Sequence, residues 1–448
     1  MQYPDVDHLV PVVDLLAETG KYTIKILTYQ NRVDFDNDPR VDYLKKKYGI
    51  KVKPLSDYYP ISSTIPWRLY EWRIYWGGKC KTTKPFWIFG RNMKSIFYPR
   101  FHVFRIFRFI IDRVLKSWLG GKAWGDRAVM LEQPNVVVLD HAFATEWIGS
   151  FIRQLKERQV PTISFPHSSF MFTHSQVLHV EKKADLPQIS EDEFPWDCIL
   201  VESRMRVKIL NDLGIPSTNI YPLGCIRFTK WWNDQLSHIG RQFENDAVDR
   251  RPIVLYLASG TNITLEKGMN QLKKLMILYQ DRIRFVVKVH ARRSRTEIFS
   301  ELMAKGIEVV GNEISSAVLI NAADYVIITA SSTVNDAILK GKKIVDVRFT
   351  MDNETTFAKY RAVYPVFSFE ELKEVFDNMA KFQWTPNLEA SSIDSYIREC
   401  VHGGHESENE LIENCLKLFS EAVSATSIKD FKIKLDHTRS KLMSRIRA

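Results

Sequence analysis

The sequence predicts an α/β protein with two domains, each built around a parallel sheet, and a cleft between them. Short apolar runs alternate with amphipathic helical segments, which is typical of right-handed βαβ units. The apolar runs lack a polar alternation, as expected of strands that are buried on both faces. A length of 448 residues is natural for two domains, and 45% hydrophobic residues is ordinary for globular cores.

Residues 1–240 have the pattern of a first, Rossmann-like domain. Gly214 and Pro216 end its last helix, because neither residue continues a helix well. The expected elements are helix 6–18, strand 23–28, strand 135–139, helix 145–157, strand 162–165, strand 198–201, helix 205–213 and an apolar stretch at 220–223.

Polar residues 233–251 are the expected linker to a second Rossmann-like domain over residues 252–425. Gly341 suits the end of a helix that starts after Ser332 and runs to Lys340. Residues 426–448 form a basic amphipathic tail, which we interpret as a surface contact or a frayed helix. The other expected elements are strand 253–257, helix 269–279, strand 283–289, helix 295–305, strand 308–310, helix 314–321, strand 325–328, strand 343–347, helix 370–376 and helix 408–421.

Residues 61–130 form a basic, aromatic insertion in the first domain, which we expect to be helical. This segment holds 14 Lys and Arg residues against three acids, and 16 aromatic residues. Such a composition suits an anionic membrane surface, single-stranded nucleic acid, or a subdomain that buries its rings. We expect an anionic membrane surface as the partner of residues 61–130, and no nucleic acid.

Several protein classes do not fit the composition. Five scattered cysteines are too few for a disulfide framework or a zinc site, so we expect reduced thiols in the cytoplasm. We see neither a cleavable signal peptide nor an apolar stretch long enough to span a bilayer. Asp34 and Asp36 imitate a metal-binding Asp-x-Asp motif but lie in an acidic loop, so we predict no metal. The motifs of P-loop NTPases and NAD enzymes are absent.

Polar residues follow the apolar runs of the second domain where parallel strands would end. Lys288 and His290 end one run, and alternation puts both on one side of the strand. The triplet Ser331–Thr333 follows a later run and can cap the next helix, whose free N–H groups would face a phosphate. Both motifs should lie at the carboxyl edge of one sheet, where open α/β folds bind nucleotides.

The order of these motifs resembles that of the GT-B glycosyltransferases that build bacterial surface polysaccharides. The similar group includes CDP-glycerol glycerophosphotransferases, capsule Kdo-transferases and polysialyltransferases, and the resemblance covers roughly residues 135–350. The sequence departs from the family pattern at Ser168, Ala291 and Asp336, where glycine, proline and glutamate are usual. The matching motifs are Pro166-His167-Ser, Asp197…Ser203, Gly224-x-x-Arg227, Lys288-x-His290 and Ser331-Ser332…Asp336-Ala337.

The resemblance implies that His290 and the serine pair bind the phosphate of a donor nucleotide. Charge develops on phosphate oxygens as a nucleotide leaves, so positioned N–H, hydroxyl and cationic donors are needed. A turn at Ser259 and Gly260 also lets the backbone approach a phosphate. The predicted donor-binding residues are Lys288, His290, Ser331, Ser332, Thr333, Ser259, Gly260 and Asp336.

The acceptor hydroxyl requires a general base, which we expect from the first domain. A histidine suits this role near neutral pH. The resemblance favours His167, and the alternatives are Asp140 and His141, although Asp140 is equally suited to cap a helix. Glu146 and Arg227 are expected to bind the acceptor or another anion, unless Arg227 forms a surface salt bridge.

We therefore expect a metal-independent transferase at the inner face of the cytoplasmic membrane. It would use a CMP-, CDP- or UDP-linked donor, without a cofactor, to extend a cell-surface polysaccharide or lipid-linked glycan. One alternative is an enzyme like UDP-N-acetylglucosamine 2-epimerase, although the expected Gly-Thr-Arg-Pro opening is absent. Another is a non-catalytic membrane-surface binding protein, which would leave the phosphate motifs without a purpose.

Overall fold

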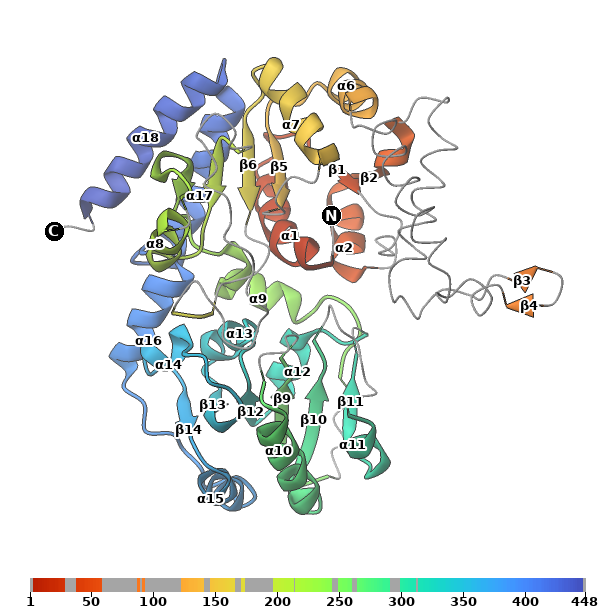
Figure 1. Ribbon diagram of the computed structural model, residues 1–448, viewed down its shortest axis with the longest axis vertical. Helices are drawn as coiled ribbons and strands as arrows, with labels where there is room; N and C mark the ends of the chain where they lie inside the picture. Colours follow the sequence, from red (N-terminus) through yellow and green to blue (C-terminus); the bar gives the residue numbers. More distant parts are fainter. Residues whose placement is uncertain are drawn as a thin grey trace, which may run out of the picture.

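Figure 1 shows the computed structural model, in which an N-terminal lobe lies above a C-terminal lobe. Both lobes contain parallel sheets covered by helices, which confirms the predicted α/β class. The structure describes residues 3–28, 38–58, 87–88, 91–92, 122–140, 146–165, 171–173, 196–212, 214–243, 249–259, 264–290, 299–311 and 313–445.

The N-terminal lobe contains a four-stranded parallel sheet in the order β5-β6-β7-β8 and a parallel pair of strands, β1 and β2. Helix α2 starts after Asp38, whose side chain accepts from the Arg40 N–H, and ends at Gly49 in the left-handed conformation. The elements are α1 (Tyr3–Glu18), β1 (Lys25–Thr28), α2 (Pro39–Tyr48), β2 (Lys51–Pro54), η1 (Leu55–Tyr58), α6 (Lys122–Glu132), β5 (Val137–Asp140), α7 (Glu146–Glu157), β6 (Thr162–Phe165), β7 (Cys198–Leu200), α8 (Arg204–Asp212), η3 (Ser217–Asn219) and β8 (Ile220–Tyr221).

The C-terminal lobe contains a six-stranded, fully parallel sheet in the order β11-β10-β9-β12-β13-β14. Counted along the chain this is 3-2-1-4-5-6, the doubly wound order, with its switch point between β9 and β12. The elements are β9 (Ile253–Leu257), α10 (Glu266–Tyr279), β10 (Arg284–Lys288), α11 (Ser300–Ala304), β11 (Glu308–Val310), α12 (Ser316–Ala322), β12 (Tyr325–Ile328), α13 (Val334–Leu339), β13 (Lys343–Val347), η6 (Arg348–Thr350), α14 (Thr356–Lys359), β14 (Tyr364–Val366) and α15 (Phe369–Met379).

Both faces of the six-stranded sheet are buried, which explains the continuous apolar runs. Leu255 and Val286 belong to the core under α12 and α13, which we call the first face. Tyr256 and Val287 belong to the core under α10 and α15, the second face. Alternation along β10 therefore places Lys288 on the first face, with Val286.

The predicted linker is partly helical. The lobes are joined by η4 (Ile226–Phe228) and α9 (Lys230–Leu236), so the polar stretch from residue 233 begins inside a helix. Trp232 is fully buried with Val6 and Leu44, because α9 packs against α1 and α2. The polar composition of residues 233–251 did not indicate this packing.

The last two helices cover the sheet of the other lobe. The chain leaves the C-terminal lobe through α16 (Ala390–Tyr396) and a π-helical turn, η7 (Ile397–Val401), and continues into α17 (Glu408–Ser424) and α18 (Ile428–Arg445). Leu418 of α17 and Phe431 of α18 are buried in the same core as Ile163 and Leu200 of the N-terminal sheet (Figure 1). Helix α17, which falls in the predicted domain 252–425, and α18, which falls in the predicted basic tail 426–448, therefore pack against the N-terminal lobe.

The two connections between the lobes touch through glycine backbone. Leu223 and Ile226 lie in the N-terminal core and Cys225 in the first face of the C-terminal sheet, so the two cores meet on either side of Gly224. Gly224 has φ +93°, and a Cβ there would lie 2.7 Å from the carbonyl carbon of His402. Gly403, on the returning connection, has φ +66°, and its Cβ would lie 2.5 Å from the nitrogen of Gly224. Only residues without a Cβ allow these backbones to approach so closely.

Most of the basic insertion lies outside the described residues. Within residues 61–130 the structure gives a short antiparallel pair, β3 (Trp87–Ile88) and β4 (Arg91–Asn92), and the first part of α6. The predicted helical character of the rest therefore remains a prediction. Over the part of the chain that is described, no helix is long and apolar enough to cross a membrane.

Candidate functional site

The predicted phosphate motifs lie at the carboxyl edge of the C-terminal sheet, as expected. Ser259 follows β9, His290 follows β10, and Ser331 follows β12. However, β9 lies between β10 and β12 in the sheet, so the two motif-bearing strands are about 10 Å apart. Their side chains must lean over the end of β9 to reach one ligand, at the switch point where open α/β sheets bind ligands.

The turn after β12, residues 330–333, has strained backbone and unpaired donors. Ala330 adopts φ +51°, in the left-handed region that disfavours residues with a Cβ by about 1–2 kcal/mol. The N–H groups of Ser332 and Thr333 have no acceptor among the residues that the structure describes. Strain of this kind is concentrated at functional sites. The turn therefore presents backbone donors at the switch point.

The hydroxyl groups of this turn are also unpaired. Thr333 is the N-cap residue of α13, but its side chain makes no capping hydrogen bond, which differs from the predicted capping role. Ser331 is buried, whereas Ser332 and Thr333 are half-buried. For the three hydroxyls no partner lies within the described ranges. They remain available to an anion at this edge.

Lys288 is bound to its own sheet. Its ammonium group donates to the carbonyl of Gly311, at the end of β11, and the side chain is buried. Burial lowers the pKa of Lys288 to about 8, although Glu313 raises it. His290 is half-buried two residues further on. The proposed ligand roles of Lys288 and His290 stay predictions.

Arg227 and Asp336 bind each other across the two lobes. The two terminal nitrogens of Arg227 lie 2.7 and 2.8 Å from the two carboxylate oxygens of Asp336, and both residues are buried. Burial lowers the pKa of Arg227, but the carboxylates of Asp336 and Asp7 raise it above its usual range. Asp336 was predicted to bind the donor, and Arg227 to bind an anion or form a surface salt bridge; in the structure the two side chains form a buried ion pair with each other.

The pair is part of a longer ionic network. Asp7 of α1 lies 3.1 Å from Nε of Arg227 and 2.7 Å from a terminal nitrogen of Arg40. Arg40 in turn donates to Asp38 at 2.7 Å. Burial raises the pKa of Asp7, but Arg227 and Arg40 together lower it below its usual range. The network connects α1 and α2 of the N-terminal lobe, through η4 in the connection, with α13 of the C-terminal lobe.

A loop contact joins the lobes beside the turn. Phe172, from the N-terminal lobe, forms a β-bridge with Thr355, and the Thr356 N–H donates to the Met171 carbonyl at 2.7 Å. Phe172 also packs against Ala330 and Met351. The strained turn therefore lies at the interface of the two lobes.

Sequence reasoning missed Asp346 in β13, although an aspartate inside an apolar run was a visible signal. Asp346 is fully buried, and neither carboxylate oxygen has a hydrogen-bond partner in the described part of the chain. A terminal nitrogen of Arg348 lies 3.6 Å from it. Burial raises the pKa of Asp346 to about 7, although Arg348 lowers it. Asp346 pairs with Ile328, the last residue of β12, so it lies one strand from the turn.

We expect Asp346→Asn to flatten the pH dependence of stability between pH 4 and 7. The folded carboxyl binds its proton more tightly than the unfolded one, whose pKa is about 3.8. The wild-type protein therefore loses roughly 4 kcal/mol of unfolding free energy as pH rises through this window, and little above it. Urea unfolding of both proteins at several pH values measures the difference. If the unfolding free energies of the two proteins changed equally with pH, the burial argument would be contradicted.

The predicted N-terminal site residues are only partly described. Asp140 is the last residue of β5 and Glu146 the first of α7, but the structure describes neither side chain. His141, His167 and Gly260, as well as Asp34 and Asp36, lie outside the described residues. In the described ranges, no group of three or more His, Cys, Asp or Glu residues could hold a metal ion. The roles of these residues remain predictions.

No family model and no curated protein matches this chain. Among solved structures, a UDP-N-acetylglucosamine 2-epimerase is similar at a TM-score of 0.50, with 10% identity over 93% of this chain and 92% of that chain. The UDP complex of MnaA from S. aureus has a TM-score of 0.49, with 12% identity over 94% of this chain and 95% of that chain. The wall teichoic acid polymerase TagF has a TM-score of 0.35, with 12% identity over 72% and 98%. The similarity to the first structure supports the two-domain, GT-B-like fold that the sequence predicts.

Proposed function

We propose that this protein is a transferase that uses a nucleotide-activated sugar or polyol. The observation that carries the proposal is the turn at residues 330–333. It holds two backbone N–H groups and three hydroxyls that have no partner among the described residues, at the switch point of a doubly wound sheet. A dense set of donors without protein partners suits the oxygens of a phosphate.

The same geometry suits stabilisation of a leaving nucleotide. Negative charge grows on the phosphate oxygens while the bond to the transferred group breaks. Donors that are already positioned need no reorganisation at that moment. The strained backbone at Ala330 holds the turn in one conformation, and its packing against Phe172 links that conformation to the N-terminal lobe.

The acceptor is proposed to bind from the N-terminal lobe, which would supply the base. We retain His167 as the first candidate for proton abstraction and Asp140 and His141 as alternatives. The acceptor class, a cell-surface polysaccharide or lipid-linked glycan, rests on the motif resemblance. The basic residues of segment 61–130 support an approach to an anionic membrane surface, since each cation near such a surface contributes about 1 kcal/mol.

A sugar-nucleotide epimerase is the second candidate. Strand β5 ends at Asp140, α7 follows, and β6 ends at Phe165, two positions before His167. This order of strand, aspartate, helix, strand and histidine resembles that of the 2-epimerases. The two functions differ in the need for an acceptor. A transferase releases free nucleotide when an acceptor is present, whereas an epimerase converts one nucleotide sugar into another without an acceptor.

Binding of a nucleotide tests the proposed site. We expect one of CMP, CDP, UDP and GDP to raise the melting temperature, because a ligand at a hundred times its Kd adds about 2.7 kcal/mol of stability. The double variant Ser331→Ala/Ser332→Ala should weaken this shift, since it removes two of the three hydroxyl donors of the turn while its backbone N–H groups remain.

Ser391 and Ser392 provide a matched control. They form a serine pair in α16 and have no side-chain hydrogen-bond partner among the described residues. Ser391→Ala/Ser392→Ala should retain the nucleotide shift. Equal shifts in both double variants would place nucleotide binding elsewhere, and no shift with any nucleotide in the wild-type protein would refute the proposal.

A further inference from the structure

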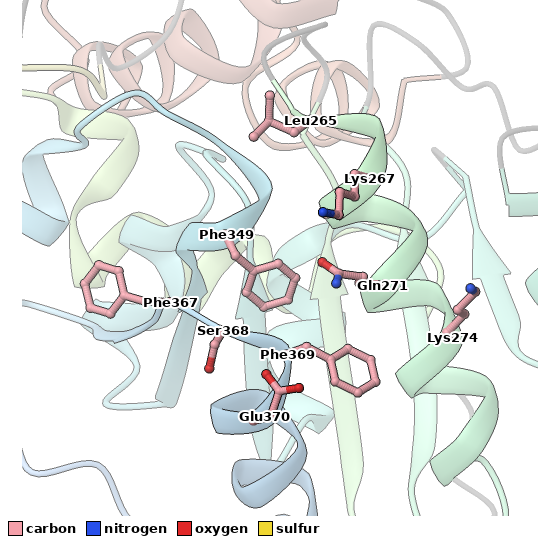
Figure 2. A pocket seen from close by; sticks show the side chains of 10 residues that line it. Leu265, Lys267, Gln271, Lys274, Phe349, Phe367, Ser368, Phe369 and Glu370 are labelled. Atoms are coloured by element: carbon pink, nitrogen blue, oxygen red, sulfur yellow. The ribbon is translucent and has the colours of Figure 1, made fainter.

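A groove on the C-terminal lobe lies outside the site described above. It has a volume of about 570 Å³ and lies between the start of α10 and the start of α15. Figure 2 shows Lys267 and Gln271 on α10, with the rings of Phe349 and Phe369 facing that helix. Pockets of this size hold small organic ligands. The lining residues are Leu265, Lys267, Gly268, Gln271, Lys274, Phe349, Phe367, Ser368, Phe369 and Glu370.

Tight backbone contacts fix the two walls of the groove. A Cβ on Gly268 would lie 2.5 Å from the carbonyl oxygen of Phe349, so α10 and η6 pack without space between them. The Leu265 N–H donates to the Thr350 carbonyl at 2.6 Å. On the other wall, Ser368 caps α15 and the Phe367 N–H donates to the Glu371 carboxylate at 2.7 Å. The groove is therefore built into the fold and does not depend on flexible side chains alone.

The aromatic wall is unusually open to solvent. Phe367 is 65% exposed, while Phe349 and Phe369 are half-buried and pack against the core of the second face. Exposed apolar groups gathered at one place mark binding surfaces. Ring faces of this kind accept the apolar face of another ring, whether a base or a sugar.

The opposite wall carries polar groups without protein partners. Lys267, Gln271 and Lys274 are spaced by four and three residues, so they lie on one side of α10. In the portion of the chain that is described, neither lysine has an ion-pair partner, and Glu370 has none either. The two lysines are about 10 Å apart along the helix, although Figure 2 shows the Lys274 amine turned away from the rings.

We propose that this groove binds a segment of an acidic oligosaccharide. The phenylalanine rings would pack against sugar rings, Gln271 and Glu370 would bind hydroxyl groups, and the lysines would bind acidic groups separated by about two sugar units. This inference rests on the proposed function for the idea that the protein handles a glycan. The groove would then bind a part of the glycan that is distant from the acceptor end at which transfer takes place.

The groove and the turn at residues 330–333 are bordered by different helices. The turn at residues 330–333 leads into α13, whose side chains Val334 and Ala337 belong to the first face of the sheet. The helices α10 and α15 that form the groove cover the second face. The helices that border the two sites therefore cover opposite faces of the same sheet, and competition with a nucleotide tests whether both sites can be occupied together.

Binding of a hyaluronan hexasaccharide, measured by calorimetry, tests the proposal. This probe carries one carboxylate on every second sugar. We expect binding to weaken at least tenfold in Lys267→Glu/Lys274→Glu and also in Phe367→Ser, in which the charge is unchanged. Lys208→Glu/Lys305→Glu, which reverses two exposed lysines outside the groove, is the control for net charge and should bind like the wild-type protein.

Four results would overturn the inference. They are the absence of saturable hyaluronan binding to the wild-type protein, equal affinities in all variants, equally tight binding of polyglutamate, and displacement of the hexasaccharide by CMP or UDP. The nucleotide melting shift of Lys267→Glu/Lys274→Glu separates this inference from the proposed function. If that shift persists while hexasaccharide binding is absent, only the groove assignment fails; if no protein shows the shift but the groove binds the hexasaccharide, only the proposed function fails.

Discussion

Replacing Asp336 with alanine is expected to destabilise the protein by about 3–5 kcal/mol, because it removes one partner of a buried ion pair. Arg227 would keep its charge in the interior, and Asp7 at 3.1 Å would be its remaining ion-pair partner among the described residues. Urea unfolding of the variant and the wild-type protein measures the loss.

Two controls identify the cause of this loss. Asp377→Ala removes a partner of Arg282 in an ion pair that is half exposed, so it should change stability little. Arg227→Met/Asp336→Leu removes both charges and should recover much of the stability lost in the single variant. A loss at Asp336 no larger than that at Asp377 would show that the buried pair contributes nothing to the contact between the lobes.

The second large effect is expected at the crossing of the two connections. Gly224→Ala would place a methyl group 2.7 Å from the carbonyl carbon of His402, at φ +93°, so backbone has to move. We expect a loss of several kcal/mol or failure to accumulate folded protein. Gly403→Ala should act alike, since the two glycines face each other.

Gly341 provides a control that has the left-handed backbone conformation without the steric clash. It also has a left-handed φ of +62°, but no atom lies within 4 Å of an added Cβ. Gly341→Ala should therefore cost only about 1–2 kcal/mol and yield folded protein. Melting temperatures and soluble yields of the three variants provide the comparison. Similar values for Gly224→Ala and Gly341→Ala would mean that the close approach is easily relieved.

The sequence was sufficient to predict five of the six strands of the C-terminal lobe, whereas β14 (Tyr364–Val366) was not predicted and 343–347 was the last predicted strand. The predicted strands 308–310, 325–328 and 343–347 agree with β11, β12 and β13. Strands buried on both faces produce continuous apolar runs with clear ends, and turns with glycine or serine mark those ends. For the same reason the phosphate motifs could be placed at the carboxyl edge before the structure was known.

Contacts between distant parts of the chain could not be predicted in this way. Arg227 and Asp336 are 109 residues apart, and each has an ordinary local pattern of a ligand-binding residue. The left-handed φ of Ala330 depends on packing against Phe172 and Met351, which local sequence does not encode. The amphipathic pattern of α17 indicates a buried face, but it does not indicate which sheet that face will cover.

The return of the last two helices to the first lobe has a consequence for synthesis on the ribosome. The sheet that contains Ile163 and Leu200 buries its face against Leu418 and Phe431, which are translated more than two hundred residues later. The nascent N-terminal portion must therefore leave an apolar surface open until α17 and α18 have been synthesised. Because such surfaces aggregate, chaperone demand should be greatest for nascent chains that end before α17.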